Sequence, residues 1–436
     1  MSPIGSVASS PTPDSKPSLL ERAPEPKPLE PDGNDEGEEP GSSNLTGPAH
    51  FELVGQPPLA LQRICDLTVI ADQLFATHAV SALGSDGATV SRFRADQPKT
   101  PFQVAFDWNR PGEPSRGGGA GQGFLRARAL SGRLFVPDAD PPYYGFWLSH
   151  TSPEGFVFVS DSQGDFARAR RPGYLPPAPP SETSKSGAGI LPGAYHVLDV
   201  IRFRDHYYAS TGAVPRGGHA NQAEAPGVLY VADPGFAHWQ HAAEYPHPAV
   251  PGVTRLTFLV RFRDRLYAGV QDFDARGGID YVYWAPPPDV SELRPEDMHA
   301  VRATEDGAAA TYRWYADRGQ LYWISATRSG VALRRTADGE HWIHVPLPSE
   351  FGPPTDIVRF GPELFVLTEW ALLRLDERGA HPVAHVRTKR SPFQLGDYFC
   401  AAPLVVYRNQ IYAGGQDRGR LYRVVEGDAP ADPTPK

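Results

Sequence analysis

One pattern of apolar and polar residues recurs seven times along this chain. Each copy has an apolar run, a two-residue polar turn, and then Leu, Ile or Tyr followed by an aromatic residue. The copies end at Leu74-Phe75, Leu134-Phe135, Tyr207-Tyr208, Leu266-Tyr267, Leu321-Tyr322, Leu364-Phe365 and Ile411-Tyr412. Self-similarity at about 40–50 residues per unit, built from short strands, is typical of a β-propeller. We therefore predict an all-β fold: a seven-bladed β-propeller with four-stranded antiparallel blades.

The pattern also predicts individual strands, named a to d from the inside of each blade outward. Those of the fourth repeat are Arg255–Phe262, Leu266–Gln271, Asp280–Trp284 and a strand near His299–Ala303. Those of the fifth are a strand near Thr311–Tyr315, then Leu321–Ala326, Val331–Arg335 and Trp342–Val345. The seventh has only Leu404–Tyr407, Gln410–Gly414 and Arg420–Val425. We expect Phe51–Val54 to supply its missing outer strand and close the ring, because closure removes open sheet edges.

The two cysteines occupy matching positions in the first and last repeats. Cys65 precedes strand a of the first, and Cys400 precedes strand a of the last. Those repeats are neighbours in a closed ring, so a Cys65–Cys400 disulfide is one interpretation. The other is two buried thiols that pack as small apolar groups. A disulfide would indicate an oxidising compartment.

Composition divides the chain into three parts. Residues 1–49 are rich in Pro, Ser, Glu and Gly, and hold nine Asp or Glu against three Lys or Arg, a net −6. They cannot bury enough apolar area to offset their ordering entropy, so we expect a disordered acidic N-terminal tail. Residues 50–426 form the predicted propeller, and 427–436 a disordered C-terminal tail.

Charge and hydropathy limit the classes of partner and the cellular locations that the sequence allows. The net charge is −9 and there is no block of five Lys or Arg residues, which disfavours nucleic acid. No apolar stretch approaches the ~20 residues of a membrane span. No apolar core of a secretory signal follows Met1. We expect a monomer, exported with its leader absent from this chain, or cytoplasmic as the alternative.

A second motif lies between the third and fourth strands of a repeat. Thr336, Asp338, Gly339 and Trp342 resemble the shortened Asp-box of sialidase-like propellers, a Ser/Thr-x-Asp-Gly-x-x-Trp turn. We expect looser copies at Asp233-Pro234-Gly235 with Trp239, at Asp376 to Gly379, and at Glu154-Gly155-Phe156. In that family the box is a structural turn remote from the active site, so the resemblance implies architecture more than chemistry.

Sialidase activity is not supported by the same residues. The Arg-Ile-Pro element that the family usually carries is absent from the sequence. Most arginines fall in the turns between strands a and b, such as Arg204, Arg263 and Arg408, where solvated turn charge is the simplest interpretation.

Loop length predicts which face of the ring binds a ligand. The a–b turns are tight, whereas long insertions at 109–123, 171–193 and 211–227 are assigned to d–a and b–c connections, which share the opposite face. Long loops on a rigid scaffold are where binding usually resides. We expect the residues just after strand b to surround the channel mouth there: His78, Asp138, Asp140, Arg216, His219, Gln271, Asp272, Asp274, Arg328, Glu369, Gln416 and Asp417.

These side chains allow two functions. The first is a non-enzymatic binding propeller whose partner is a protein or a carbohydrate. The second is a carbohydrate-active enzyme, a glycoside hydrolase or lyase, drawing its acid and base from the mouth carboxylates. We expect no cofactor; the run from Asp272 through Asp274 to Asp280 resembles a calcium loop but lacks its third acidic ligand and its bidentate Glu.

Overall fold

The computed structural model describes residues 45, 47–57, 63–79, 88–97, 99–108, 123–139, 154–167, 187–212, 227–245, 254–272, 278–307, 309–396 and 399–427. All of them belong to one compact unit, Asp32–Lys436. Strands dominate it, beside two short 3-10 helices, η1 (Pro295–Asp297) and η2 (Ser349–Phe351). No helix in the described part of the chain is long and apolar enough to cross a membrane. Most of the two predicted tails lies outside the described residues.

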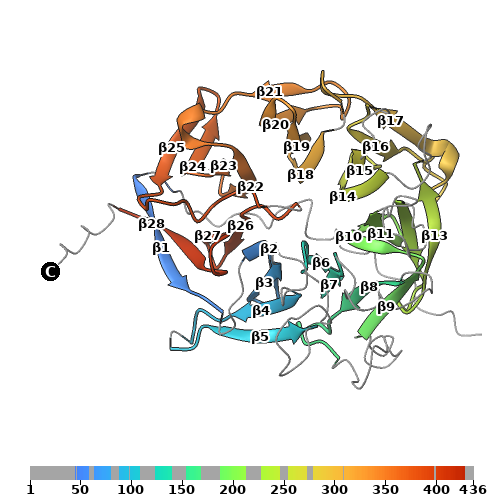
Figure 1. The fold of residues 1–436 in the computed structure, drawn as a ribbon, viewed down its shortest axis with the longest axis horizontal. Helices are drawn as coiled ribbons and strands as arrows, with labels where there is room; N and C mark the ends of the chain where they lie inside the picture. Colours follow the sequence, from blue (N-terminus) through green and yellow to red (C-terminus); the bar gives the residue numbers. More distant parts are fainter. Residues whose placement is uncertain are drawn as a thin grey trace, which may run out of the picture. The chain divides into compact units, whose positions relative to one another are not determined.

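Five separate four-stranded antiparallel sheets follow one another along the chain (Figure 1). The first is β2 (Arg63–Ile70), β3 (Gln73–Ala79), β4 (Thr89–Phe93) and β5 (Phe102–Asp107). The second is β6 (Arg128–Leu130), β7 (Arg133–Pro137), β8 (Glu154–Val159) and β9 (Gly187–Pro192). The third is β10 (Tyr195–Phe203), β11 (His206–Gly212), β12 (Val228–Ala232) and β13 (Trp239–Glu244). The fourth is β14 (Thr254–Phe262), β15 (Arg265–Asp272), β16 (Tyr281–Trp284) and β17 (Met298–Val301). The fifth is β18 (Ala310–Asp317), β19 (Gln320–Thr327), β20 (Gly330–Thr336) and β21 (Ile343–Val345).

The remaining eight strands form one continuous sheet. They are β22 (Pro354–Phe360), β23 (Glu363–Thr368), β24 (Ala371–Asp376), β25 (Gly379–His385), β26 (Leu404–Tyr407), β27 (Gln410–Gly414), β28 (Leu421–Glu426) and β1 (Ala49–Gly55). Their order is β22-β23-β24-β25-β1-β28-β27-β26. The structure therefore has five separate blades and one eight-stranded sheet, rather than seven separate sheets. The cause is one parallel contact, Ala49 with Ala384, which joins β1 to the end of β25.

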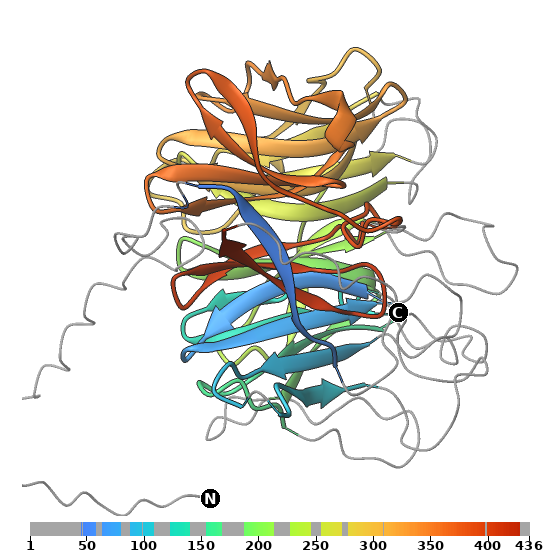
Figure 2. The same cartoon turned by 90° about the vertical axis from the view of Figure 1, so that its left-hand side faces the viewer.

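The predicted closing strand is confirmed. β1 pairs antiparallel with β28, and Phe51 lies opposite Val424. Figure 2 shows β1, in blue, crossing the side of the ring from the orange strands toward the cyan ones. At its far end Gly55 lies against the ring of Phe102 in β5. One strand thus contacts β25, β28 and the first sheet.

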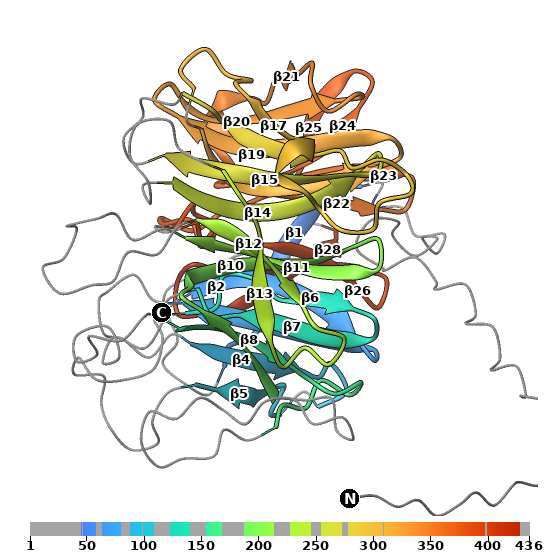
Figure 3. The ribbon, with the colours of Figure 1, turned by 90° about the vertical axis from the view of Figure 1, so that its right-hand side faces the viewer.

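The predicted strands of the fourth, fifth and seventh repeats also form, with ends shifted by a few residues at most. In Figure 1 the first strand of each sheet faces the centre. Figure 3 shows the opposite side, where β13 lies in front of β12 as the outer strand of its sheet. The packed layers between sheets are rich in aromatic residues. An example is the stacked pair Trp314 and Trp323, with ring centroids 5.3 Å apart, which remove large apolar areas from water.

Strand order assigns each connection to one of two faces. We call the face that carries the b–c and d–a connections the mouth face, and the one that carries the a–b and c–d turns the turn face. Insertions 109–123 and 211–227 fall between β5 and β6 and between β11 and β12, and these strands end and begin on the mouth face, which agrees with the predicted d–a and b–c assignments. The third assignment was wrong. Residues 160–186 join β8 to β9, so they start and end on the turn face, and Gly187–Pro192 is a strand.

Candidate functional site

The structure describes seven of the twelve predicted mouth side chains. Arg328 and Asp417 are exposed; Gln271, Glu369 and Gln416 are half-buried; His78 and Asp138 are buried. Asp140, Arg216, His219 and Asp274 lie outside the described residues, as does the side chain of Asp272, the last residue of β15. Apart from the adjacent residues Gln416 and Asp417, the described members sit in different blades.

His78 lies inside the first blade instead of lining the mouth. Its Nδ1–H donates to the Arg63 carbonyl at 3.0 Å, and Nε2 accepts from the Ser91 hydroxyl at 2.8 Å. Burial lowers the pKa of His78 to about 4 despite the bond to Arg63. The ring is therefore a neutral link between β2 and β4, and both of its nitrogens are occupied.

Asp138 is likewise a buried residue, 1% exposed. Its backbone N–H donates to the Phe156 carbonyl, and its carbonyl accepts from the Val197 N–H at 3.1 Å. The residue thus links the second blade to the first strand of the third. This placement removes Asp138 from the surface where a ligand would meet a mouth carboxylate.

The carboxylate of Asp280, the last acidic residue of the calcium-like loop, is not available as a cation ligand. Its two carboxylate oxygens accept the backbone N–H groups of Ala303, Thr304 and Ala309, each at 2.7 Å, and the Thr304 hydroxyl. The side chain is fully buried. A carboxylate so occupied shapes the d–a connection that follows β17 and has no free oxygen for a cation.

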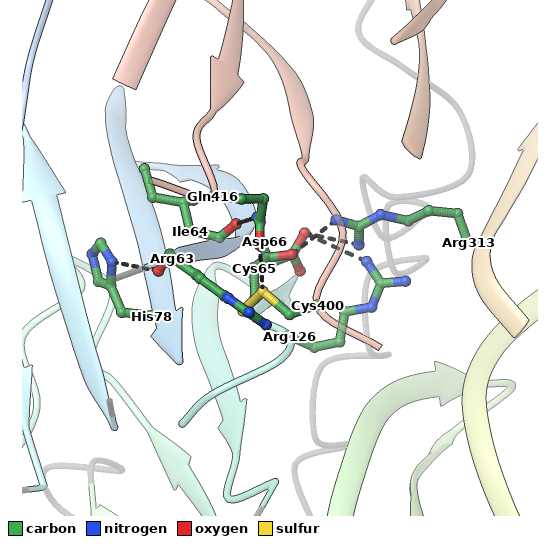
Figure 4. The surroundings of a disulfide bond; sticks show 9 residues. All are labelled: Arg63, Ile64, Cys65, Asp66, His78, Arg126, Arg313, Cys400 and Gln416. Atoms are coloured by element: carbon green, nitrogen blue, oxygen red, sulfur yellow. Dashed lines mark hydrogen bonds and ion pairs between the residues drawn. A yellow bond between two sulfur atoms is a disulfide. The ribbon is translucent and has the colours of Figure 1, made fainter. Parts of the chain in front are cut away.

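Gln416 closes the ring at the mouth face. Its amide Nε2 donates to the Ile64 carbonyl at 2.6 Å, and its Oε1 lies 3.4 Å from Cys400 Sγ (Figure 4). Its backbone N–H donates to the Pro392 carbonyl. The next residue, Asp417, pairs with Arg420 at 3.1 Å. These contacts link the last blade to the first strand of the first blade.

Sequence reasoning missed a polar group between the third and fourth blades. Arg255 donates to Gln271 Oε1 at 3.3 Å and contacts His196 Nε2 at 3.1 Å. Because the guanidinium only donates, His196 Nε2 accepts and Nδ1–H donates to the Ala139 carbonyl at 2.8 Å. His196 has a φ of 53°, in the left-handed region that non-glycine residues rarely adopt. This backbone places its ring beside Gly212, where a Cβ would lie 2.6 Å from the His196 Cβ.

Three inner strands carry a buried aspartate at the same position, four residues before the strand ends. Each accepts a backbone N–H from the inner strand that follows it in the ring, or from the residue just before that strand: Asp66 from Ala127 at 3.0 Å, Asp199 from Leu259 at 2.8 Å, and Asp356 from Leu404 at 2.7 Å. A backbone irregularity precedes each aspartate in its strand. The matching spacing in Cys65-Asp66-Leu67, Leu198-Asp199-Val200 and Thr355-Asp356-Ile357 was a signal that could have been found in the sequence.

Two arginines contact two of these aspartates, Asp66 and Asp356, near the centre of the ring. Arg313 lies 3.2 Å from Asp66, which Arg126 also approaches at 3.5 Å (Figure 4). Arg313 also lies 3.3 Å from Asp356. The Arg126 guanidinium also covers the Phe258 ring at 4.1 Å. Burial raises the pKa of Asp356 to about 6, although Arg313 and two backbone N–H groups oppose the rise. The network draws on the first, second and fifth blades and on the eight-stranded sheet.

The predicted disulfide is present and lies beside this network. Cys65 and Cys400 are bonded, with Cα atoms 4.7 Å apart and each residue 1% exposed. Phe399, which packs edge-on against Phe258 at 5.9 Å, belongs to the same apolar cluster. Among the described residues, the disulfide, the aromatic rings and the ion pairs lie together, buried near the centre of the ring.

On the turn face, the motif at Thr336–Trp342 is a hydrogen-bonded turn. Asp338 Oδ1 accepts the backbone N–H groups of Glu340 and His341, each at 2.8 Å, and these bonds hold the pKa of Asp338 well below its usual range. The Gly339 carbonyl accepts from Tyr281 in the fourth blade at 2.9 Å. Gly339 has a φ of 85°, and a Cβ there would meet the Tyr267 hydroxyl at 2.0 Å. The turn therefore fastens the fifth blade to the fourth.

Two of the three looser copies occupy equivalent turns. Asp233 accepts the Ala237 N–H at 3.0 Å, and Asp376 the Arg378 N–H at 2.8 Å. Glu154-Gly155-Phe156 was misplaced, because it begins strand β8. The turn that follows β8 is built instead around Asp161, which accepts the N–H of Asp165 at 2.9 Å.

The arginines of the a–b turns are more than solvated charge. Arg204 pairs with Asp264 of the next blade at 2.9 Å, and Arg408 pairs with Asp72 at 2.7 Å. Arg263 lies over the neighbouring Phe262 ring at 5.7 Å. The turn face is thus occupied by contacts between adjacent blades.

Comparison with known proteins identifies the fold. No family model and no curated protein matches the chain. Among solved structures, a streptogramin B lyase matches with a TM-score of 0.50 at 8% identity, over 87% of this chain and 98% of that one. PorZ, from Porphyromonas gingivalis, matches with a TM-score of 0.50 at 14% identity, over 84% of this chain and 47% of that one. A virginiamycin B lyase from Staphylococcus aureus matches with a TM-score of 0.49 at 8% identity, over 87% of this chain and 99% of that one. At these identities the two matches with a TM-score of 0.50 show a β-propeller fold alone, and nothing of its ligand.

Proposed function

We propose that this chain is a non-enzymatic binding propeller that presents its mouth face to a protein or glycan. The observation that carries the proposal is the burial of side chains near the centre of the ring. Arg126, Arg313 and the Cys65–Cys400 disulfide are buried where an axial substrate pocket would lie. A ligand that meets this ring therefore contacts the loops of a face, which suits a macromolecular partner better than a small enclosed substrate.

The carboxylates support the same choice. A glycosidase needs two carboxyl groups about 5–9.5 Å apart across a cleft, one of them free to donate a proton. Among the described candidates, Asp138 is buried and Asp417 is paired with Arg420. Asp356, whose raised pKa would suit a general acid, is itself buried under backbone and arginine contacts. The enzymatic alternative rests on Glu369 and on mouth carboxylates outside the described residues.

The finer architecture is part of the proposal. We count each four-stranded half of the eight-stranded sheet as one blade, which gives seven blades around the ring. The turn at Thr336–Trp342 acts as an Asp-box of the sialidase-like type. A buried disulfide that joins the two ends of the ring favours an oxidising, extracytoplasmic compartment.

The experiment compares matched arginines at the two ends of β19. Arg328 is exposed on the mouth face and Arg318 is exposed on the turn face of the same blade. The full chain is screened on a glycan array and by affinity capture, and the ligand found is then titrated against R328E and R318E. Weaker binding by R328E alone supports the proposal. Loss of binding by R318E alone, or turnover of a glycan by the wild-type chain, overturns it.

A further inference from the structure

The connection after β25 carries a run of exposed positive charge. Arg387, Lys389 and Arg390 are all exposed. Within the described part of the chain no ion pair joins any of the three to a carboxylate. The Thr388 hydroxyl donates to the Arg390 carbonyl at 2.7 Å, which bends the segment. We call residues Arg387–Arg390 the basic loop.

Both ends of the basic loop are anchored. On one side the Val386 N–H donates to the Trp370 carbonyl at 2.9 Å. On the other, the Ser391 hydroxyl donates to the Glu369 carbonyl, and Phe393 is fully buried. The three cations are therefore held on a fixed support, which lowers the entropy lost when they bind an anionic partner.

The N-terminal part of the chain meets the ring at this loop. Leu45, 6% exposed, belongs to the same apolar cluster as Ala384 and Phe393, which flank the basic loop. Ala49 pairs directly with Ala384. Leu45 and Ala49 are therefore held against the part of the ring that carries the basic loop.

The segment just upstream has the complementary charge. Residues 32–39 contain Asp32, Asp35, Glu36, Glu38 and Glu39 and no Lys or Arg. Glu39 precedes Leu45 by six residues, which span up to ~20 Å when extended. A tether this short gives an effective concentration in the millimolar range, where several weak charge pairs act together.

We propose that the basic loop is an interaction surface for acidic peptide, and that its occupant is the chain's own segment 32–39. The interaction is carried by exposed charges, so it is strongest at low ionic strength and weakens as salt shortens the Debye length from ~10 Å at 0.1 M. The proposal does not depend on the function assigned to the mouth face.

The first test uses carbodiimide cross-linking of the full chain, followed by peptide mass spectrometry. The reagent joins an amine directly to a carboxylate in contact with it. Lys389 and Lys99 are the two lysines among the described residues, and both are exposed, with Lys99 in the turn between β4 and β5 as the control. We expect peptides from 32–39 joined to Lys389 at least tenfold more often than to Lys99 in 20 mM salt, and few in 0.5 M salt. Equal yields at the two lysines, or yields that salt does not change, would overturn the proposal.

The second test identifies the occupant. The full-chain variant E36Q/E38Q/E39Q and the wild type are titrated with a fluorescent synthetic peptide of residues 30–42. We expect the peptide to bind the variant at least tenfold more tightly than the wild type, since the wild-type loop is already occupied. We also expect this binding to be lost when the substitutions R387E and R390E are introduced into the same variant. Equal binding to both chains would mean a loop open to some other acidic partner, and binding to neither would mean no such surface; each outcome overturns the proposal.

Discussion

Removing the Cys65–Cys400 cross-link should destabilise the ring by an amount that the sequence separation sets. The two residues are 335 positions apart. In the chain-entropy treatment, a cross-link across a loop of that length removes conformational entropy from the unfolded state and raises its free energy by roughly 5–6 kcal/mol. We take about 5 kcal/mol as the stability lost when the cross-link is removed. The strands run from Ala49 to Glu426, about 380 residues. An unfolding entropy of ~2.1 cal/mol/K per residue then gives a fall in Tm of about 6 °C.

The assay is thermal unfolding followed by circular dichroism for C65A, C400A and the double variant. Each single substitution already removes the whole cross-link, so we expect three nearly equal Tm values, and wild type in reductant should approach them. Buried packing would behave differently. Both sulfurs are buried, and losses that came from packing would add in the double variant. Additive losses, or a wild-type Tm that reductant leaves unchanged, would refute the reasoning.

Three further outcomes are expected. Deleting residues 1–43 should leave Tm unchanged, whereas deleting 1–56 should lower it sharply by unpairing β28, and equal midpoints would contradict the closing role of β1. The pKa of Asp356 is raised to about 6 in the folded protein, so the stability contributed by its protonated form is full below pH ~4 and is lost as pH rises through about 6. The wild-type free energy of unfolding should therefore fall by on the order of 3 kcal/mol between pH 4 and 7. D356N should remove this pH dependence, as measured by denaturant titrations across that range. D338A should cost ~1–2 kcal/mol of unfolding free energy through two lost turn bonds while ligand affinity is retained, and a loss of affinity with an unchanged melt would contradict the structural role.

The strand pattern predicted the fold well because inner strands of a propeller have strong local signals. The near-identical runs at 200–209 and 259–268 each span the a–b turn of one hairpin, and the strands formed there. The disulfide was predicted by position in the repeat, which does not depend on side-chain direction. Strand β9 was missed because Gly187–Pro192 has a Gly and Pro content typical of loops. Its pairing to β8 is a tertiary effect that no local propensity shows.

The candidate site was harder to predict than the fold. A predicted strand boundary places a residue near one face of the ring, but it does not give the direction of that residue's side chain. His78 and its neighbour Thr77 are both fully buried, since a propeller strand is covered on both faces and simple alternation fails. The central aspartates were overlooked for the opposite reason. A charged residue inside an apolar run is usually read as an exposed position, yet Asp66, Asp199 and Asp356 face the next blade.

The junction between the last and first blades differs from every other junction in the ring. Elsewhere, strand d of one blade is followed in the sequence by strand a of the next, so the connecting chain keeps neighbours together. At this junction the neighbours are β26 and β2, which come from opposite ends of the sequence. The structure places its covalent link here, at the inner edge through Cys65 and Cys400, and the pairing of β1 with β28 at the outer edge. Because both act on one junction, removing either alone leaves the other to hold the ring, and their contributions to stability should not be independent.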